Sequence, residues 1–288
     1  MPKIYLPSVK AYRDIDQIVA FGCSMTQGSE LCDNLRYPAI PNVEEYKKSF
    51  KDIHDWYRSL GTELEPGFRE EERKLAWPSQ LAKLYSIPCY NYAEGGSGFE
   101  KQLTQFIKAV YDKKITDKTL VVWGLTTKER GIWIQPHQEI TGYLLNGVMD
   151  PGELPSDAKN FWYMHVNSNM MLYWKYYNCL SIMFNWASEF CNDQFLFVQS
   201  VGQDLVDKNC FNEVELEYLS SNPVYLEIVR TFQDMLISKS KKYRIFNDER
   251  HFFHDWTGPN KLGGGHPTLS AHIKYAEMIK FELGKSID

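Results

Sequence analysis

Short, uninterrupted apolar runs alternate along the chain with longer segments in which apolar residues recur every three or four positions. The first pattern is typical of buried strands, and the second is typical of amphipathic helices. We predict strands over residues 17–21, 88–92, 119–123, 194–199 and 243–246. We predict helices that begin at Trp77 and that cover residues 99–112, 168–192, 223–239 and 268–283.

This alternation of strands and helices indicates the α/β fold class. Strands that read as continuous apolar runs are expected to be covered by helices on both faces. The pattern therefore predicts a three-layer α/β/α sandwich around a mostly parallel sheet of about five strands.

Glycine-containing turns follow the first three predicted strands, at residues 22–28, at 94–98 and from 124 onward. In parallel sheets of this kind, reactive groups lie in the loops beyond the carboxyl ends of the strands. We therefore expect Ser24, Gly96 with its neighbour Gly95, and Thr126 to lie near one another.

Two loop-rich stretches interrupt the pattern, and we interpret them as insertions into a single domain that spans all 288 residues. The stretch 29–75 is charged and carries one predicted short helix around residues 43–60. The stretch 131–165 contains several prolines and glycines, and we expect it to form a cap or lid. Aromatic residues gather between Trp133 and Trp186, either as the lining of a pocket or as a helix face packed on the sheet.

The charge balance argues against a nucleic-acid partner. The formal net charge is −5 and the pI is near 5.9, and the short basic run at residues 239–244 is typical of a solvated helix end. The N-terminus lacks the basic and apolar regions of a signal peptide, and no window approaches the roughly 18 apolar residues of a membrane span. We expect a cytoplasmic protein with no membrane partner, or a virion-associated one if the chain is encoded by a phage.

The six cysteines are scattered along the chain without paired spacing. In a chain with no export signal, such cysteines are expected to be reduced. We therefore predict free thiols, most of them buried.

Ser24 follows a predicted strand and precedes a predicted helix start. Backbone N–H groups at a helix start lack intrahelical acceptors and can stabilise an oxyanion, so a serine at this position is a candidate nucleophile. The alternative interpretation is that Ser24 caps the helix, which is a role that serine fills well.

His266 is preceded by three glycines and followed by a proline, just before the last predicted helix. An imidazole can take the proton of a serine hydroxyl near neutral pH, which makes His266 a candidate base. The glycines offer no side chains to pack on the ring, so a core position is not expected. The alternative is a solvated histidine at a helix start. His272, inside that helix, is interpreted as structural or partly exposed.

Taken in order, these segments resemble the blocks of the SGNH (GDSL-type) hydrolase superfamily. Its strand followed by Gly-Asp-Ser, its second block and its Asp-x-x-His-Pro block correspond here to Phe21–Ser24, Asn91–Gly96 and Gly263–Pro267. The resemblance covers the chain apart from the two insertions, and it looks closest to a branch, common among phage-encoded proteins, that reads Gly-Cys-Ser-[Met/Phe]-Thr. It implies a flavodoxin-like sandwich, with Ser24 and His266 as catalytic residues and the Ser24 and Gly96 N–H groups in an oxyanion hole.

Three positions depart from the superfamily pattern. Thr126 stands where the third block has an Asn that donates to the oxyanion, and a hydroxyl has a shorter reach than an amide. Gly263 stands where the last block has the Asp that orients the histidine. Asp255 in the same loop is the candidate replacement, with Asp248 or a backbone carbonyl as alternatives. Cys23 replaces the Asp of the first block, and we expect it to pack in the core.

Two residues are candidates for substrate binding. Arg130 could bind a substrate carboxylate or phosphate, or it could pair with an acid such as Glu129 or Glu100. Asn91 is expected to lie beside the substrate. Its expected role there is to hold the turn that follows the second strand.

Metal and nucleotide sites receive little support from the sequence. His251, His254 and Asp255 could join His266 around a metal ion, but no strand or Cys partner supports that site, so we predict no metal. The turn at 94–98 lacks the Gly-Lys-Ser/Thr of a phosphate-binding loop, so we predict no nucleotide cofactor.

The leading hypothesis is an ester or acyl hydrolase that needs no cofactor and acts on a small-molecule, carbohydrate or lipid ester. The second is a scaffold of the same fold without catalysis, which acts as a binding or assembly module with a virion partner or with copies of itself. The third is acyl transfer, in which the cap excludes water.

Overall fold

A five-stranded sheet forms the centre of the fold, and all neighbouring strands in it are parallel. The computed structural model describes residues 15–29, 31–32, 68–126, 131–133, 143–145, 169–191, 194–199, 213–224, 226–228, 230–231, 234, 245–246 and 266–284. The strands are β1 (Gln17–Phe21), β2 (Cys89–Asn91), β3 (Thr119–Leu125), β6 (Phe195–Gln199) and β7 (Ile245–Phe246). Their order, β2-β1-β3-β6-β7, is that of flavodoxin-like sheets, which confirms the predicted fold class.

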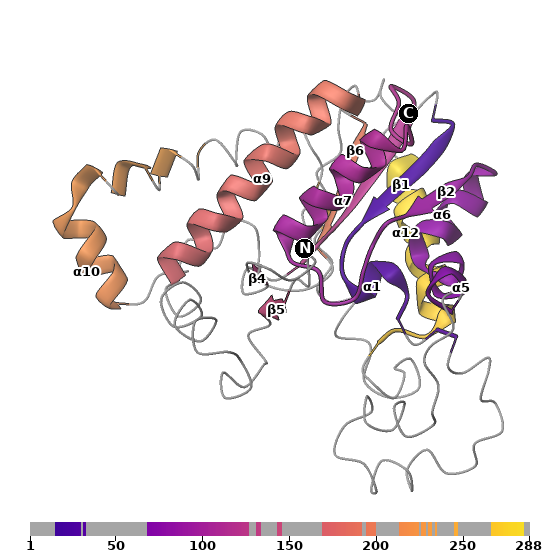
Figure 1. The fold of residues 1–288 in the computed structure, drawn as a ribbon, viewed down its shortest axis with the longest axis horizontal. Helices are drawn as coiled ribbons and strands as arrows, with labels where there is room; N and C mark the ends of the chain where they lie inside the picture. Colours follow the sequence, from indigo (N-terminus) through magenta and orange to yellow (C-terminus); the bar gives the residue numbers. More distant parts are fainter. Residues whose placement is uncertain are drawn as a thin grey trace, which may run out of the picture.

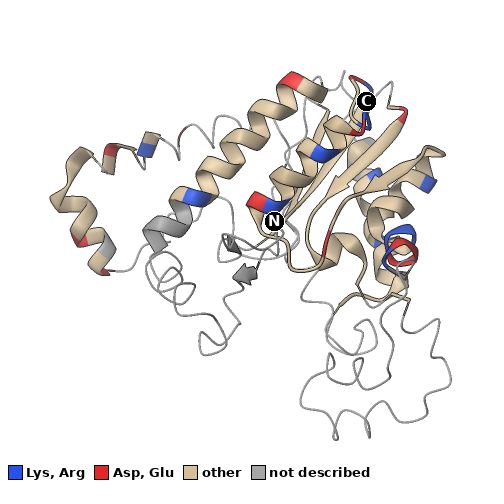
Figure 2. Ribbon diagram, viewed as in Figure 1, with Lys and Arg blue, Asp and Glu red and all other residues tan. Residues whose placement is uncertain are grey.

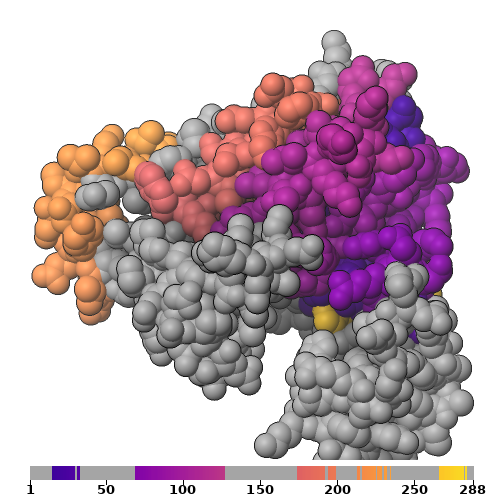
Figure 3. Space-filling view, in the orientation of Figure 1, coloured from indigo at the N-terminus to yellow at the C-terminus, as the bar shows by residue number. Residues whose placement is uncertain are grey.

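Helices cover both faces of the sheet and complete the three layers (Figure 1). On one face lie α6 (Trp77–Tyr85) and α12 (Leu269–Gly284), and on the other lie α7 (Phe99–Tyr111) and α9 (Asn169–Cys191). The remaining labelled elements are α1 (Ser24–Gln27), α5 (Phe68–Leu75), α10 (Glu213–Ser221) and the antiparallel pair β4 (Gly131–Trp133) and β5 (Tyr143–Leu145). In the space-filling view, α7 and α9 cover the near face of the sheet (Figure 3).

Alternate residues of each central strand face opposite layers, as the pleat of a strand requires. In β1, Val19 and Phe21 pack in the layer of α7 and α9, and Ile18 and Ala20 pack in the layer of α6 and α12. Both faces are covered, so every residue of β3 is buried. This double burial explains why the strands read as uninterrupted apolar runs, and why no charged residue lies in the five-stranded sheet (Figure 2).

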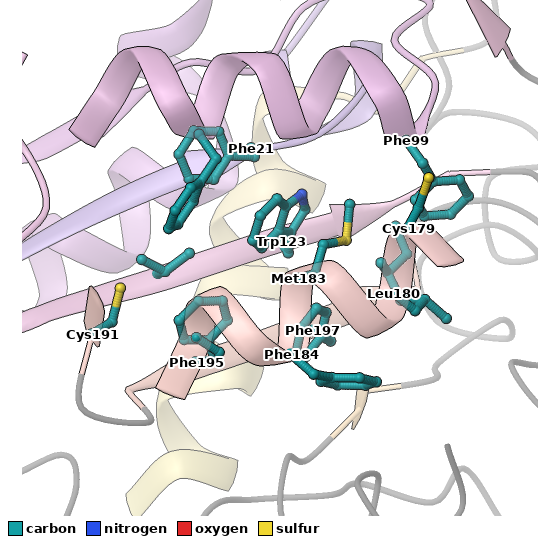
Figure 4. Packing of buried hydrophobic residues seen from close by; sticks show 14 of the residues in the cluster. Phe21, Phe99, Trp123, Cys179, Leu180, Met183, Phe184, Cys191, Phe195 and Phe197 are labelled. Carbon is teal, nitrogen blue, oxygen red and sulfur yellow. The ribbon is translucent and has the colours of Figure 1, made fainter. Parts of the chain in front are cut away.

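An aromatic cluster fills the layer between the sheet and helices α7 and α9 (Figure 4). The ring of Phe106 lies 5.3 Å from that of Trp123 and 5.5 Å from that of Phe21, measured between ring centroids. Tyr177 and Phe184 of α9 are buried in the same cluster. The α9 part of the aromatic-rich stretch therefore packs on the sheet, as the packing interpretation expects.

Two helices differ from the sequence prediction. Helix α5 lies within the stretch that we interpreted as a charged, irregular insertion; only its two end residues, Phe68 and Leu75, are apolar, so apolar periodicity cannot reveal it. Helix α10 begins Glu-Val-Glu-Leu-Glu-Tyr, an alternation that is typical of strands rather than helices. The predicted short helix around residues 43–60 lies outside the described residues.

The predicted cap is described only at β4 and β5, which pair as an antiparallel hairpin, with β4 in contact with α7. The rest of residues 131–165 lies outside the described residues, so the cap and the single-domain organisation stay predictions. Among the helices in the described part of the chain, none combines the length and apolar character that a bilayer crossing demands.

Candidate functional site

Ser24 lies directly beyond the carboxyl end of β1, as predicted. The cap residue of α1 is Cys23, which is fully buried, and Ser24 is the first helical residue. The capping interpretation for Ser24 is therefore wrong, because its neighbour occupies that position. Ser24 is half-buried, and its hydroxyl makes no hydrogen bond to any described residue.

A glycine at position 22 allows the chain to turn sharply between β1 and α1. A β-carbon on Gly22 would lie 2.3 Å from Thr26 Oγ1, a distance that no ordinary contact permits. The Gly22 carbonyl also accepts the N–H of Glu94 at 3.1 Å, which joins the turn after β1 to the turn after β2. The two turns are therefore held side by side.

The turn at 94–98 places Gly95 against Ser24. A β-carbon built on Gly95 would lie 3.9 Å from Ser24 Cβ. The Gly95 N–H donates to Gln27 Oε1, and the Ser97 N–H donates to the Glu94 carbonyl at 3.1 Å.

Gly96 lies in the middle of this turn with φ of +73°, a conformation that favours glycine. The N–H groups of residues 94, 95 and 97 all donate hydrogen bonds, whereas the Gly96 N–H has no acceptor among the described residues. Gly96 therefore carries an N–H of this turn that no described residue accepts.

Asn91 ends β2 and ties α1 to the same loop. Its Nδ2 donates to the Thr26 carbonyl at 2.8 Å, and its Oδ1 accepts the Ala93 N–H at 3.0 Å. Both functional atoms of the side chain are thus engaged within the protein. Asn91 holds its turn, as expected, and contact with a substrate stays a prediction.

Thr126 follows β3 at the same end of the sheet and is fully buried. Its Oγ1 has no hydrogen-bond partner among the described residues. Nearby, the Gln102 side chain of α7 donates to the Gly124 carbonyl at 3.3 Å and so ties the start of α7 to the end of β3. The role of Thr126 as an oxyanion donor stays a prediction.

His266 lies three residues before α12 begins and is partly exposed. The segment that enters α12 lies at the same end of the sheet as α1 (Figure 1). No hydrogen bond joins His266 to Ser24 within the described residues, so their pairing stays a prediction. Catalytic hydrogen bonds are often long in ligand-free structures and tighten when substrate binds.

His272, the second histidine of this segment, is fully buried, so the prediction of a structural role holds and that of partial exposure is wrong. Its Nδ1 accepts the Trp77 N–H at 2.9 Å. Burial, and then the proximity of His266, lower the pKa of His272 to about 3. His272 is thus neutral at physiological pH, and the effect of His266 on it shows that the two rings are near each other.

Several candidate residues lie outside the described part of the chain: Arg130, Asp248, His251, His254, Asp255 and Gly263. The group that orients His266, the cation for a substrate anion and the alternative metal site therefore stay predictions. Conversely, the structure brings two residues to the site that the sequence analysis missed, Gln27 and Glu72. Gln27 lies in the same short helix as Ser24, which is the one signal that could have pointed to it.

The thiols at and around the site agree with the sequence analysis. Cys23, Cys32, Cys179 and Cys191 are buried and Cys89 is half-buried, all five as free cysteines, and Cys210 lies outside the described residues. Burial raises the pKa of Cys89 and of Cys179 to about 12. These two thiols are protonated at neutral pH and are not nucleophiles.

Neither a family model nor a curated protein sequence matches the chain. Among solved structures, the chain is similar to a member of the lipolytic protein G-D-S-L family from Veillonella parvula, with a TM-score of 0.38 and 11% sequence identity. The match covers 92% of this chain and 98% of that one. A similarity of this size does not establish common descent, so the function has to be inferred from the site itself.

Proposed function

We propose that the protein is a serine ester or acyl hydrolase in which Ser24 is the nucleophile and His266 is the general base. The observation that carries this proposal is the contact between the Ser24 turn and the glycine turn at 94–98. Among the described residues, the half-buried Ser24 hydroxyl makes no hydrogen bond, and the turn packed against Ser24 at Gly95 carries the Gly96 N–H, which has no acceptor there. Such a pair is what nucleophilic attack on a carbonyl needs.

In the proposed reaction, Ser24 Oγ attacks the carbonyl carbon of the ester while His266 takes the hydroxyl proton. The negative charge that develops on the carbonyl oxygen is stabilised by the N–H groups of Ser24 and Gly96, with the Thr126 hydroxyl assisting. His266 then returns the proton to the leaving alkoxide, which leaves an acyl group on Ser24. Water, deprotonated by His266, attacks the acyl-enzyme; the bond from the acyl carbon to Ser24 Oγ breaks, and His266 returns the proton to Ser24 Oγ as the free acid leaves. Every bond change uses the substrate, water and these side chains.

Asp255 is the proposed partner that orients the His266 ring, since the pattern of the last block lacks its own acid. A carboxylate in that role fixes the imidazole tautomer, and its loss in a serine triad can lower kcat by as much as ~10⁴-fold. The substrates that we expect are small-molecule, lipid or carbohydrate esters.

Ser24→Ala tests the nucleophile, with Ser29→Ala as the matched control from the same turn. We expect a fluorophosphonate probe to label the wild type and Ser29→Ala but not Ser24→Ala. Hydrolysis of short-chain p-nitrophenyl esters should fall by more than ~10³-fold in Ser24→Ala alone. Equal labelling of Ser24→Ala and wild type would refute the assignment.

A second candidate function is a non-catalytic binding or assembly module on the same scaffold. The absence of a hydrogen bond between Ser24 and His266 within the described residues is the observation that favours it. A wild-type protein that is folded but neither labelled nor active on esters would support this candidate over the hydrolase.

A further inference from the structure

We propose that Gln27 is a positioning residue that sets the geometry of the oxyanion hole, and that Glu72 of α5 holds its side-chain amide in the required orientation. This inference rests on the proposed function, because it assigns a role to residues around the Ser24 and Gly96 N–H groups. The juxtaposition behind it is a buried chain of hydrogen bonds from α5 through α1 to the glycine turn.

The hydrogen bonds of Gln27 allow only one orientation of its amide. The side chain is 2% exposed; its Oε1 accepts the Gly95 N–H and its Nε2 donates to Glu72 Oε2 at 3.3 Å. A backbone N–H can only donate, so the Gly95 N–H requires the Gln27 oxygen and leaves the Gln27 amide N–H₂ to face Glu72. Rotating the amide by half a turn would set donor against donor and acceptor against acceptor, so the two partners together fix it.

Gln27 acts on the site through Gly95. A β-carbon on Gly95 would lie 3.2 Å from Gln27 Oε1 and 3.9 Å from Ser24 Cβ, so Gln27, Gly95 and Ser24 are packed against one another. By accepting the Gly95 N–H, Gln27 fixes the Glu94–Gly95 peptide, which directly precedes the peptide that carries the Gly96 N–H. Through this restraint, Gln27 limits how the Gly96 N–H can turn relative to Ser24.

Helix α5 supports this arrangement from the other side. Glu72 is 4% exposed, and its neighbour Arg73 donates from Nε and Nη2 to the Ala93 carbonyl at 3.2 and 3.1 Å. Two consecutive residues of α5 therefore fix both α1 and the loop that leads into the glycine turn. Part of the first insertion is thus built into the site.

Gln27→Met tests the proposal. Methionine has a similar length, but its thioether is a weak acceptor for the Gly95 N–H and has no N–H to donate to Glu72. We expect kcat on a p-nitrophenyl ester to fall about ten-fold or more with little change in KM, since a misplaced oxyanion donor weakens the transition state alone. The matched control is Gln17→Met at the opposite end of β1, where the amide donates to the Lys114 carbonyl at 3.0 Å. Its kcat should match the wild type. Equal kcat for Gln27→Met and Gln17→Met would overturn the proposal.

An exchange of the two side chains provides a rescue. Gln27→Glu alone places two carboxylates against each other and should lose activity. In the double variant Gln27→Glu with Glu72→Gln, the carboxylate at position 27 can accept both the Gly95 N–H and the amide at position 72. We expect kcat to recover by about ten-fold over Gln27→Glu. A double variant that only combines the losses of the two single variants would overturn the pairing.

A measurement without substrate separates this inference from the proposed function. In the wild type, the Gly95 amide should exchange with deuterium more slowly than the Gly96 amide, and Gln27→Met should abolish the difference. Unchanged Gly95 exchange in Gln27→Met overturns the positioning role whatever the activity. An inactive but folded wild type with the expected exchange refutes the hydrolase alone. If Gln27→Met does not fold, the exchange is measured on Gln27→Glu and on the double variant.

Discussion

His272 shows how one side chain can stabilise the junction between two helices. Trp77 is the first residue of α6, so its N–H has no acceptor within the helix, and His272 Nδ1 of α12 accepts it. The imidazole must stay neutral to accept this bond, and its burial enforces that state. The same bond occupies Nδ1, so the structural role of His272 is compatible with His266 as the proposed base.

The buried His272 predicts a loss of stability in acid. Its pKa in the folded protein is lowered from 6.5 to about 3, so the unfolded chain takes up the proton first as the pH falls. The stabilisation is therefore complete above about pH 6.5 and declines below it. Between about pH 7.5 and about pH 5.5, we expect the wild type to lose about 1.4 kcal/mol more unfolding free energy than His272→Asn. Urea unfolding at both pH values measures this, and equal losses would contradict it.

Gly22 predicts a second effect at the scale of one residue. In Gly22→Ala, the new β-carbon would lie 2.3 Å from Thr26 Oγ1 and 2.5 Å from Thr26 Cβ, so α1 has to shift. We expect a loss of about 1–3 kcal/mol in unfolding free energy, and a loss of ester hydrolysis. In Gly95→Ala the nearest atom would be 3.2 Å away, at the end of the flexible Gln27 side chain, so its stability should change less. Equal destabilisation of the two variants would be the contrary result.

At the scale of elements, the sequence predicts best those segments whose residues are all buried, or whose buried residues recur with a regular period. The three central strands are buried on both faces, so their apolar runs could be read directly. Of the predicted edge strand 243–246, residues 245 and 246 are described, and they form β7. Helix α5 could not be predicted from periodicity. It is a charged helix in which Arg73 and Lys74 pair with Glu70 and Glu71 one turn earlier, so its apolar residues give no pattern.

The candidate site also has one part that could be predicted from the sequence and one part that could not. The nearness of Ser24 and the glycine turn follows from the rule that loops after parallel strands share one edge, so the sequence suffices. The pairing of Gln27 with Glu72 depends on how α5 packs against α1, and no local pattern encodes that contact. Long-range polar contacts of this kind need the structure.

Helix α7 predicts how strongly one layer depends on its aromatic packing. Phe106 is 1% exposed and lies among four other aromatic rings, whereas its neighbour Ile107 is 56% exposed. Phe106→Ala should lower the free energy of unfolding by about 3–5 kcal/mol, because the ring leaves a cavity that the sheet cannot fill. Ile107→Ala should change it by about 0.5 kcal/mol or less. Urea unfolding, monitored by tryptophan fluorescence, measures both variants. Similar unfolding midpoints for Phe106→Ala and Ile107→Ala would refute this prediction.

At the scale of the whole molecule, the order of strands determines where the site forms. The chain runs from β1 outward to β2 in one direction and through β3 to β7 in the other, so the loops after β1 and β3 diverge. Ligands of open α/β sheets bind where this reversal occurs. Ser24 and Thr126 lie beyond the two strands that flank it, which is where a hydrolase on this sheet would bind its substrate.

The same three layers predict that the cysteines are protected throughout the folded molecule. In a Cys210→Ser variant, the five remaining thiols are those that the structure describes as buried or half-buried. Because burial raises the pKa of Cys89 and Cys179 to about 12 and shields their sulfur atoms, we expect slow reaction with Ellman's reagent in the folded state. Guanidinium should make all five react at once. Prompt reaction of several thiols without denaturant would contradict the packing.

The central position of β1 has a consequence for how the protein is made. In the finished sheet, Val19 lies opposite both Tyr90 of β2 and Val121 of β3. On the ribosome, β1 emerges before either neighbour has been translated, and one of its two hydrogen-bonding edges stays unpaired until residues 119–125 have left the exit tunnel. Nascent chains in this condition are prone to association, and chaperones commonly shield them. Strand β1 is thus made early but assembled late, and slower translation or added chaperone is expected to raise the yield of folded protein.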